Sequence, residues 1–503
     1  MMDGPDAECV HCLDVDWCFV DFDTERIEKY FVGHPYHALR EDGYGQYAMH
    51  QLCSERYPSV NVFDFLLAND PRRYTLVKTD NEGKTPFHLA CQHISGMSPV
   101  MDYLLDRIAP IAVVRDANGN TPLHCACMNP DIPLQYFDRL MSIEVQNQAS
   151  FLRNNDNEVP LHLACHHGLP LSCIHRLVEF APTTLFITDN NDRTPLHNAC
   201  GSVGESWETV LYLADRDVKR RMQGYPDCSN NLPIHFAARQ GVSNIEVVYA
   251  LGGAKGNLLS FQNECGRTPL HVACKENSKY FGSCVKTLLE ADEDKKAVST
   301  LDNKGNLPIH CAAQCSRAER RALSMLVDAN PKSLFQCNSN GDLPIHISCK
   351  QQNATATAVF LDNDQNGESL LYENLDDHKP LFLALSTKPT RKVCAGAIIL
   401  NKILTTEKVR RLTQPKWRLN LLWATMNVRE AIYEYDTCQA ISRTKTFLSM
   451  IDKFLNLERV ALLKLKLRQL EKENSEFCGG LSAIVISKVK SYLGETGSYN
   501  EYL

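Results

Sequence analysis

The sequence predicts an all-α solenoid of stacked repeats, followed by a C-terminal helical domain. An eight-residue motif centred on Pro-aliphatic-His recurs along the chain, as in NTPLHCAC, which ends at Cys127. Each copy precedes a segment whose apolar residues recur at helical spacing, as in CVKTLLEAD from Cys284. A helix pair cannot bury such a face alone, so neighbouring pairs are expected to stack into one continuous core.

Length and composition agree with a soluble chain of several structural units. At 503 residues the chain exceeds the size at which one core stops growing. Its hydrophobic fraction of 44% and charged fraction of 22% are ordinary for a folded protein. The start MMDGPDAECVHC lacks a secretory signal, and no run of eighteen uncharged apolar residues occurs. We therefore expect a cytoplasmic protein without a transmembrane segment, with a nuclear location also open, and 21 reduced cysteines.

Residues 1–42 form an acidic N-terminal extension with 11 acidic and 3 basic residues. Three cysteines and nearby histidines invite a zinc interpretation: Cys9, Cys12, Cys18, His11, His34 and His37. The CxxC made by the first two lacks a second close pair at the spacing of zinc ribbons or fingers. We expect no structural metal in this segment.

Residues 43–385 form the repeat array. Consecutive motif histidines are separated by 35 to 39 residues, and they are His88, His124, His162, His197, His235, His271, His310 and His346. Weaker copies place His50 upstream and Phe382 downstream in the same register. The array therefore holds about ten units, and its atypical end copies are expected to cap the stack.

These motifs resemble the ankyrin family, whose repeat is a β-turn followed by two antiparallel helices opened by T-P-L-H-x-A. The resemblance implies an ankyrin-type solenoid of helix pairs with β-turn tips. It also implies that the motif histidine is a structural bond-maker. The repeats here are longer than the usual period near 33, and Pro182 and Pro331 stand where the family usually ends its second helix with glycine.

The motif also fits the chemistry of a helix start. Thr121 can cap the helix and Pro122 suits its first turn, which places His124 at the third helical position, where its ring can reach back to the turn. In four units an apolar residue replaces the threonine, and these residues are Val159, Leu232, Leu307 and Leu343. Those units are expected to depend more on packing between neighbours.

The repeated His and Cys residues could be read as metal ligands, with His124 and Cys127 on one helix face. Equivalent positions of stacked helices lie about 10 Å apart, so ligands from neighbouring repeats do not converge. Seven repeat cysteines occupy a position that Ala238 and Ala313 fill elsewhere. We therefore interpret the cysteines as small core residues and expect neither a metal nor a cofactor.

Residues 386–503 form a basic helical C-terminal domain with 20 basic and 11 acidic residues. Fewer than two clean heptads follow Val460, which favours packing on the array over a coiled coil, and a monomer is expected. The final LSAIVISKVKSYL is too short to span a bilayer, and burial is favoured over a membrane surface. Trp417 and Trp423 lie in an apolar helical pattern, which favours core residues over a nucleic-acid surface.

No phosphate-binding loop, HExxH, kinase motif set or nucleophile elbow occurs, so the sequence predicts a protein that is not an enzyme. It predicts a protein-protein interaction scaffold that binds an unidentified partner on the concave ankyrin surface. The alternative is an adapter whose C-terminal domain delivers that partner to a membrane or an enzyme complex. The candidate binding residues at the turn tips are Lys84, Asn120, Arg193, Arg267, Asn306 and Asp342.

Overall fold

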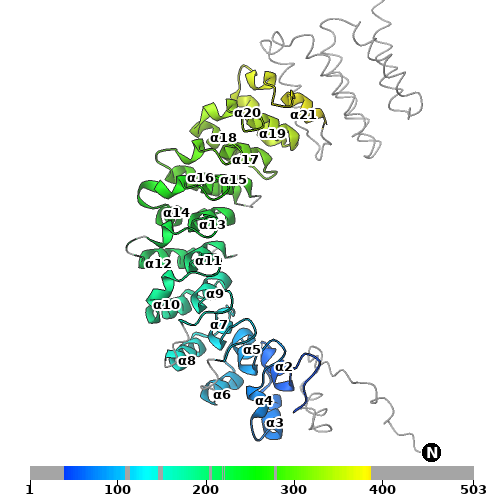
Figure 1. Ribbon diagram of the computed structural model, residues 1–503, viewed down its shortest axis with the longest axis vertical. Helices are drawn as coiled ribbons and strands as arrows, with labels where there is room; N and C mark the ends of the chain where they lie inside the picture. The colour runs from blue at the N-terminus through cyan, green and yellow to red at the C-terminus, as the bar shows by residue number, and fades with distance from the viewer. Residues whose placement is uncertain are drawn as a thin grey trace, which may run out of the picture. The chain divides into compact units, whose positions relative to one another are not determined.

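The computed structural model describes residues 39–107, 114–145, 151–202, 207–217, 219, 221–276 and 280–386 (Figure 1). Within these ranges the chain forms α-helices and 3-10 helices and no β-strand, which confirms the predicted all-α class. Nearly all of the predicted acidic extension and C-terminal domain lies outside the described residues, as do Cys9, Cys12 and Cys18. No helix among the described residues is long and apolar enough to span a bilayer.

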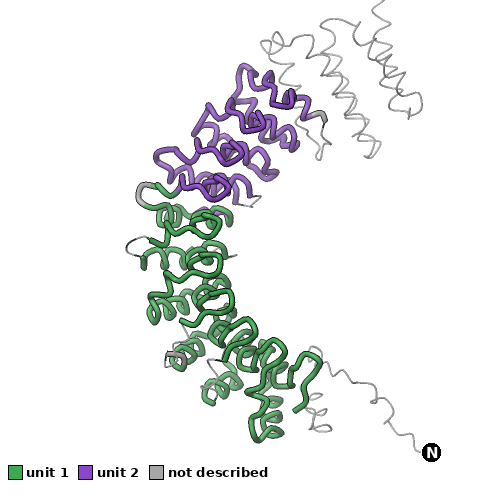
Figure 2. Tube along the Cα trace, in the orientation of Figure 1, with its two compact units in different colours: residues 1–240, 244–258 green, residues 241–243, 259–503 purple. Residues whose placement is uncertain are grey.

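The chain divides into two compact units, coloured green and purple in Figure 2. Unit 1 comprises residues 1–240 and 244–258, and unit 2 comprises residues 241–243 and 259–503. Each unit consists of helix pairs arranged in two rows. The first row holds the helices that begin with the repeat motif, and the second row holds the helices that follow them.

In unit 1 each helix packs on the next one of its own row. The first row is α2 (Ala48–Ser54), α5 (Pro86–His93), α7 (Pro122–Cys127), α9 (Pro160–His167), α11 (Pro195–Gly201) and α13 (Pro233–Gln240). The second row is α3 (Val60–Asn69), α6 (Pro99–Arg107), α8 (Leu134–Val145), α10 (Leu171–Phe180), α12 (Glu208–Arg216) and α14 (Ile245–Leu251). The short helix α4 (Tyr74–Val77) packs on α5.

Unit 2 repeats the same arrangement. Its first row is α15 (Pro269–Lys275), α17 (Pro308–Gln314), α19 (Pro344–Lys350) and α21 (Pro380–Ser386). Its second row is α16 (Phe281–Ala291), α18 (Arg320–Ala329) and α20 (Ala354–Asn363). The pairing of consecutive helices and the stacking of equivalent ones confirm the solenoid predicted from the motif spacing.

Local sequence explains where these helices begin and what they bury. From α5 onward every first-row helix starts with proline, whose fixed φ suits the first helical position and whose missing N–H would be unpaired there in any case. The second-row helix α10 buries Cys173, Ile174, Leu177 and Val178, which lie three and four residues apart on one face.

The long repeat period has a structural cause. After the second-row helix the chain makes a 3-10 helix before the next turn, and these are η5 (Pro182–Phe186), η6 (Met222–Gly224), η7 (Ala254–Ser260), η8 (Ala297–Ser299), η9 (Pro331–Phe335) and η10 (Glu368–Leu371). Pro182 and Pro331 start two of them, where their φ angles fit the turn. The extra residues therefore lie between repeats and leave the stacked helices intact.

Candidate functional site

An Asp or Asn, buried in most of the repeats, organises the turn ahead of each first-row helix. In one turn Asp116 Oδ1 accepts the backbone N–H groups of Asn118 at 2.9 Å and Asn120 at 2.7 Å. The backbone N–H of Asp116 donates to the carbonyl of Asn120 at 2.9 Å and closes the turn. Gly119 has φ +77°, which a residue with a side chain rarely adopts. The turn is thereby fixed from both its ends.

The same residue type recurs eight residues before every motif histidine and before Phe382. These residues are Asp42, Asp80, Asp116, Asn154, Asp189, Asp227, Asn263, Asp302, Asn338 and Asn374. Each accepts the N–H groups two and four residues later. The Pro-aliphatic-His motif does not include this Asp or Asn, so this residue was not identified from the sequence. Its fixed distance of eight residues from the histidine could have revealed it.

Backbone hydrogen bonds also join each turn to the next within a unit. The N–H of Ala117 donates to the carbonyl of Glu82 at 2.7 Å, and the N–H of Asn155 donates to the carbonyl of Asn118 at 2.9 Å. Gly119 permits this approach, because a Cβ at its position would lie 2.9 Å from the backbone nitrogen of Asn155. The row of turn tips is therefore held by its own backbone and presents its side chains without further ordering.

The motif histidine connects two repeats. His124 Nδ1 accepts the N–H of Thr121 at 3.2 Å, and its Nε2 donates to the carbonyl of Glu158 in the following turn at 3.2 Å. The same pair of contacts is made by His50, His88, His162, His197, His271, His310 and His346, each with the backbone carbonyl groups of its own next repeat. His235 Nδ1 likewise accepts the N–H of Leu232 at 3.1 Å.

These contacts define the protonation state of the ring. Nδ1 accepts a backbone N–H, so the proton lies on Nε2, from which it is donated to a carbonyl. Burial lowers the pKa of His124, His197 and His310 from 6.5 to about 4. The rings are therefore neutral near pH 7, with both nitrogens engaged in hydrogen bonds. This arrangement supports the structural role implied by the resemblance and leaves no lone pair for a metal.

The threonine of the motif acts differently from the predicted helix cap. Thr121 Oγ1 lies 2.9 Å from His124 Nδ1, so its hydroxyl faces the ring. Thr268 is an exception, because its Oγ1 also accepts the N–H of His271, at 3.4 Å. Where the threonine is missing, Val159, Leu232 and Leu307 are fully buried. The apolar replacements thus pack in the core, and their histidines keep the bond to the turn.

The repeat cysteines are core residues. The seven at the motif position are buried, and they are Cys53, Cys91, Cys127, Cys165, Cys200, Cys274 and Cys349. Burial raises the pKa of the Cys53, Cys165 and Cys200 thiols well above the ordinary value. Among the described residues no group of three or more His, Cys, Asp or Glu side chains is placed to hold a metal ion.

All six predicted binding residues occupy the closing position of a turn, four residues after its first Asp or Asn. Three of them, Asn120, Asn306 and Asp342, have buried side chains. Each of these three accepts a hydrogen bond from the Asn that starts the next turn, at 3.1, 2.9 and 2.7 Å. This placement favours a structural role for the three side chains, because they face the neighbouring turn and not the solvent.

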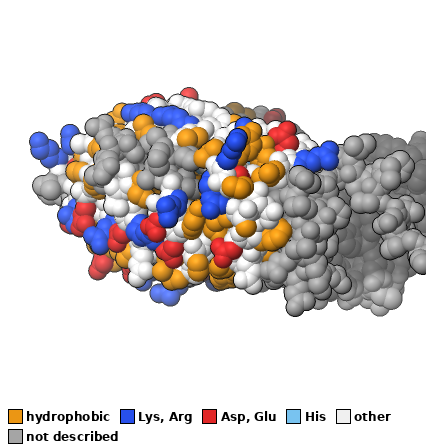
Figure 3. All heavy atoms as spheres, turned by 90° about the horizontal axis from the view of Figure 1, so that it is seen from below, with side chains coloured by type: hydrophobic (Ala, Val, Ile, Leu, Met, Phe, Trp, Pro, Cys, Tyr) orange, Lys and Arg blue, Asp and Glu red, His pale blue; other side chains and the backbone are white. Residues whose placement is uncertain are grey.

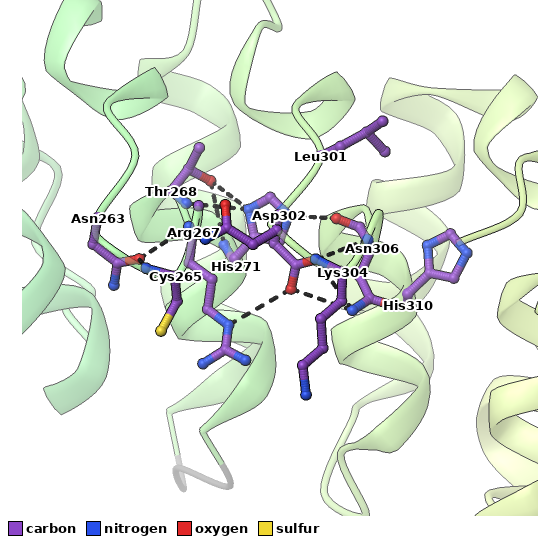
Figure 4. A network of polar contacts seen from close by, with 12 residues as sticks. Asn263, Cys265, Arg267, Thr268, His271, Leu301, Asp302, Lys304, Asn306 and His310 are labelled. Atoms are coloured by element: carbon purple, nitrogen blue, oxygen red, sulfur yellow. Dashed lines mark hydrogen bonds and ion pairs between the residues drawn. The ribbon is translucent and has the colours of Figure 1, made fainter. Parts of the chain in front are cut away.

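The other three predicted residues are charged and partly exposed. Arg267 Nε lies 3.7 Å from Asp302 Oδ2 of the next turn, as Figure 4 shows, and Arg193 Nε lies 3.9 Å from Asp227 Oδ2. Lys84 Nζ forms an ion pair with Glu82 of its own turn at 2.9 Å. The side chain of Arg193 keeps 39% of its surface exposed, the largest share of the three.

Arg193 belongs to a cluster that single-position reasoning could not find. Two guanidinium groups lie near the ring of Phe236 on α13, with the Arg193 carbon 5.3 Å and the Arg239 carbon 5.9 Å from its centre. Gly201 leaves room for this ring, because a Cβ there would lie 3.3 Å from it. Among the residues directly after the eight motif histidines, Phe236 is the one that is not buried. We name Arg193, Phe236 and Arg239 the aromatic cluster.

The exposed residues at the turn tips are mostly polar. They include Asn81, Glu82, Asn118, Asn155, Asn190, Asn191, Asn303, Lys304, Ser339 and Asn340. Figure 3 shows the surface from one end, where Lys and Arg side chains lie next to Asp and Glu side chains and hydrophobic groups. Such a mixed surface is typical of protein recognition by hydrogen bonds around a small apolar centre.

Comparisons with known proteins identify the repeat. A family model described as ankyrin repeats (3 copies) matches residues 58–133, 161–259 and 234–334. Over 145 residues, 28% of this chain, the sequence is 30% identical to inversin of Canis lupus familiaris and 29% identical to inversin of Mus musculus. The match covers 13% of the length of these relatives.

A similar solved structure is the ankyrin repeat domain of Bcl-3, described as a unique member of the IkappaB protein family. It is 22% identical, covers 48% of this chain and 99% of its own, and superposes with a TM-score of 0.37. The recurring turn, the bridging histidine and the matching family model together make this chain a member of the ankyrin-repeat family.

Proposed function

We propose that this protein is a non-catalytic scaffold that binds a partner protein on the concave surface typical of ankyrin arrays. The surface is formed by turn tips and first-row helices, and its centre in unit 1 is the aromatic cluster. The observation that carries the proposal is the partly exposed Phe236 with the guanidinium groups of both Arg193 and Arg239 near its ring. Aromatic and arginine side chains are the residue types that contribute most to binding at protein interfaces.

The chemistry of the cluster suggests what the partner presents. Two guanidinium groups beside an apolar ring fit a carboxylate next to an apolar side chain, which a folded protein or a peptide segment can supply. Residues 43–385 carry a net charge of −8, because the whole chain has −7, the segment before them −8 and the segment after them +9. A net negative array disfavours a nucleic-acid partner.

The predicted tip residues enter this proposal in two ways. Lys84, Arg193 and Arg267 have partly exposed side chains that can contact a partner directly. Asn120, Asn306 and Asp342 support the surface by fixing the distance between neighbouring turns. Disulfide-free cysteines among the described residues fit a reducing, cytoplasmic setting, and a monomeric scaffold is part of the proposal.

The test is affinity capture from native lysate with the full chain, comparing three variants. Phe236→Ala and Arg239→Ser remove parts of the aromatic cluster, and Lys350→Ser is a control, since Lys350 is exposed at the end of α19. We expect proteins captured by the wild type and the control to be depleted at least five-fold with both cluster variants. Equal capture by all forms, at unchanged melting temperatures, would move recognition away from the cluster.

The adapter alternative concerns residues 386–503, which lie outside the described residues except for Ser386. Their net charge of +9 is opposite to that of the array and is the one observation that favours a separate binding role. If residues 386–503 alone capture a distinct set of proteins, this result would support the adapter. The scaffold proposal predicts that Phe236→Ala leaves that set unchanged.

A further inference from the structure

A second surface of unit 1 combines exposed aromatic rings with arginines. Phe151 and Phe186 each lie three residues before the first residue of a turn, and they expose 41% and 40% of their surface. Arg115 and Arg153 each lie one residue before the first residue of a turn, and Arg221 lies against the ring of Phe186. We name these residues the pre-turn face and define it by Arg115, Phe151, Arg153, Phe186 and Arg221.

The arginines of the pre-turn face are held in place by uncharged groups. Arg115 Nη1 donates to the carbonyl of Arg153 at 2.7 Å, and Arg153 Nη1 donates to the carbonyl of Thr188 at 3.3 Å. The guanidinium carbon of Arg221 lies 4.4 Å from the ring centre of Phe186. Among the described residues no carboxylate forms an ion pair with any of these three arginines. The face therefore carries positive charge that the described part of the chain does not neutralise.

The equivalent positions of unit 2 carry no arginine, although Lys296 and Lys332 lie six residues before their turns, as Arg221 does. Phe335 is 47% exposed and also lies three residues before its turn. The residue directly before that turn is Cys337 and not an arginine. Exposed aromatic residues before a turn thus occur in both units, whereas the combination with several arginines belongs to unit 1.

The chain itself contains a segment of complementary chemistry. Residues 13–25 read LDVDWCFVDFDTE, in which acidic residues alternate with apolar and aromatic ones and no basic residue occurs. Such a segment can place carboxylates on guanidinium groups and aromatic side chains on exposed rings. Its composition matches the pre-turn face in both respects.

The segment is also long enough to reach the face. Fourteen residue steps separate Glu25 from Leu39, where the described residues begin, and they span up to about 45 Å when extended. Stacked helices are spaced by about 10 Å, so the turn that follows Phe151 lies roughly 30 Å along the stack from the first turn. Binding within one chain also gains from a high effective concentration.

We propose that residues 13–25 bind the pre-turn face of unit 1 in the same chain. The carboxylates of Asp14, Asp16, Asp21 and Asp23 pair with its arginines, and the aromatic residues between them cover Phe151 and Phe186. Acidic N-terminal residues thereby neutralise and shield a surface that is otherwise open to acidic segments of other proteins. This proposal does not depend on the aromatic cluster.

The first test is photo-cross-linking in the full chain with p-benzoyl-phenylalanine in place of Phe186, and in place of Phe335 as the matched control. A mixture of unlabelled and ¹⁵N-labelled chains separates contacts within a chain from contacts between copies. We expect the Phe186 probe to yield cross-links to the peptide of residues 13–25 within one chain, and the control to yield none. Cross-links between copies, to residues 386–503, or to no N-terminal peptide would overturn the proposal.

The second test uses a fluorescein-labelled synthetic peptide of residues 13–25 and fluorescence anisotropy. In a full chain carrying Asp14→Asn, Asp16→Asn, Asp21→Asn and Asp23→Asn the face is open, so the peptide should bind at least ten-fold tighter than to the wild type. Adding Arg221→Glu should weaken this binding at least five-fold, whereas Lys332→Glu, on the exposed η9 of unit 2, should not. Equal binding to the wild type and the four-Asn chain, or equal effects of the two Glu variants, would contradict the proposal.

Discussion

The histidine of each motif bonds backbone groups of two repeats that would otherwise lose their partners. In the fourth motif His197 Nδ1 accepts the N–H of Thr194 at 3.1 Å, and its Nε2 donates to the carbonyl of Asn231 at 3.2 Å. The ring is fully buried, so water cannot replace either bond. The side chain therefore sets the distance between one helix start and the next turn.

Replacing His197 by alanine should destabilise unit 1 markedly. A buried donor or acceptor without a partner costs about 1–3 kcal/mol, so the change should lower the free energy of unfolding by roughly 3 kcal/mol. Urea denaturation measures this, and hydrogen exchange at the amide of Thr194 should rise. His166→Ala is the control, because His166 is exposed at the end of α9 and its loss should stay within about 0.5 kcal/mol. Equal effects of the two substitutions would contradict the bridging role.

Stability should also depend on pH through these rings. Their folded-state pKa of about 4, for His124, His197 and His310, lies below the unfolded value of 6.5. The unfolded chain then binds more protons, so the stabilisation is complete above pH 6.5 and is lost as the pH falls towards 4. Each ring contributes up to about 3 kcal/mol to this loss. Thermal melts at pH 7, 6 and 5 should show falling midpoints, whereas equal midpoints would mean that the rings are not buried and neutral.

At the scale of the turn, neighbouring repeats recognise one another through two side chains. Where a turn starts with Asp, the closing residue of the previous turn can be a donor, as with Gln46 and Asp80 at 3.2 Å or Arg267 and Asp302 at 3.7 Å. Where a turn starts with Asn, the closing residue before it is an acceptor, as with Asp342, which accepts from the Nδ2 of the next turn at 2.7 Å. The closing residue of one turn thus supplies the hydrogen-bond donor or acceptor that the first residue of the next turn requires.

This pairing predicts a rescue by a double substitution. Arg267→Asp alone places a second carboxylate beside that of the buried Asp302. This change should lower the free energy of unfolding by roughly 2 kcal/mol or more. Adding Asp302→Asn recreates the native pair of Asp342 with Asn374, so most of the lost stability should return. A double-mutant cycle with urea denaturation measures the coupling. A double variant no more stable than Arg267→Asp would show that the two turns are not matched in this way.

One pair departs from the matching. Glu158 is the closing residue of the turn that precedes the turn of Asp189. Burial raises the pKa of Glu158, and the nearby Asp189 carboxylate raises it further, whereas the hydrogen bond from Asn154 lowers it. Glu158→Gln should therefore stabilise the protein by roughly 0.5–1 kcal/mol at pH 7, because it recreates the combination of Gln46 with Asp80. Differential scanning calorimetry at pH 7 measures the change. A lower melting temperature than the wild type would contradict the assignment.

The sequence predicted the elements of this fold more fully than the surface. Proline in the repeat motif located the start of each first-row helix from α5 onward, because local chemistry decides that position. The burial of Asn120 and the exposure of Phe236 depend instead on neighbouring repeats, through Asn154 in one case and Arg193 and Gly201 in the other. These contacts join side chains of different repeats, and the repeats are unevenly spaced along the chain, so the motif of one repeat does not reveal them.

At the scale of the molecule, one local pattern repeated along the chain accounts for both the stability of the array and the regular row of turn tips. The histidines and the turn residues fix neighbouring repeats, and this leaves the side chains at the tips free to differ. Repeat arrays of this kind depend on contacts between neighbours and not on one central core. The central claim is therefore that the motif histidines are neutral connectors between repeats and neither metal ligands nor catalytic groups.

The most direct test is nuclear magnetic resonance of the full chain labelled with ¹³C and ¹⁵N in histidine, recorded from pH 7.5 to 5 with and without zinc. We predict that the eight motif histidines keep the Nε2–H tautomer at neutral pH and that zinc leaves their signals unchanged. His124, His197 and His310, with pKa values of about 4, should remain neutral down to about pH 5. The signal of the exposed His166 serves as the reference within the same sample. Motif signals that titrate near pH 6.5, or that shift with zinc, would contradict the account.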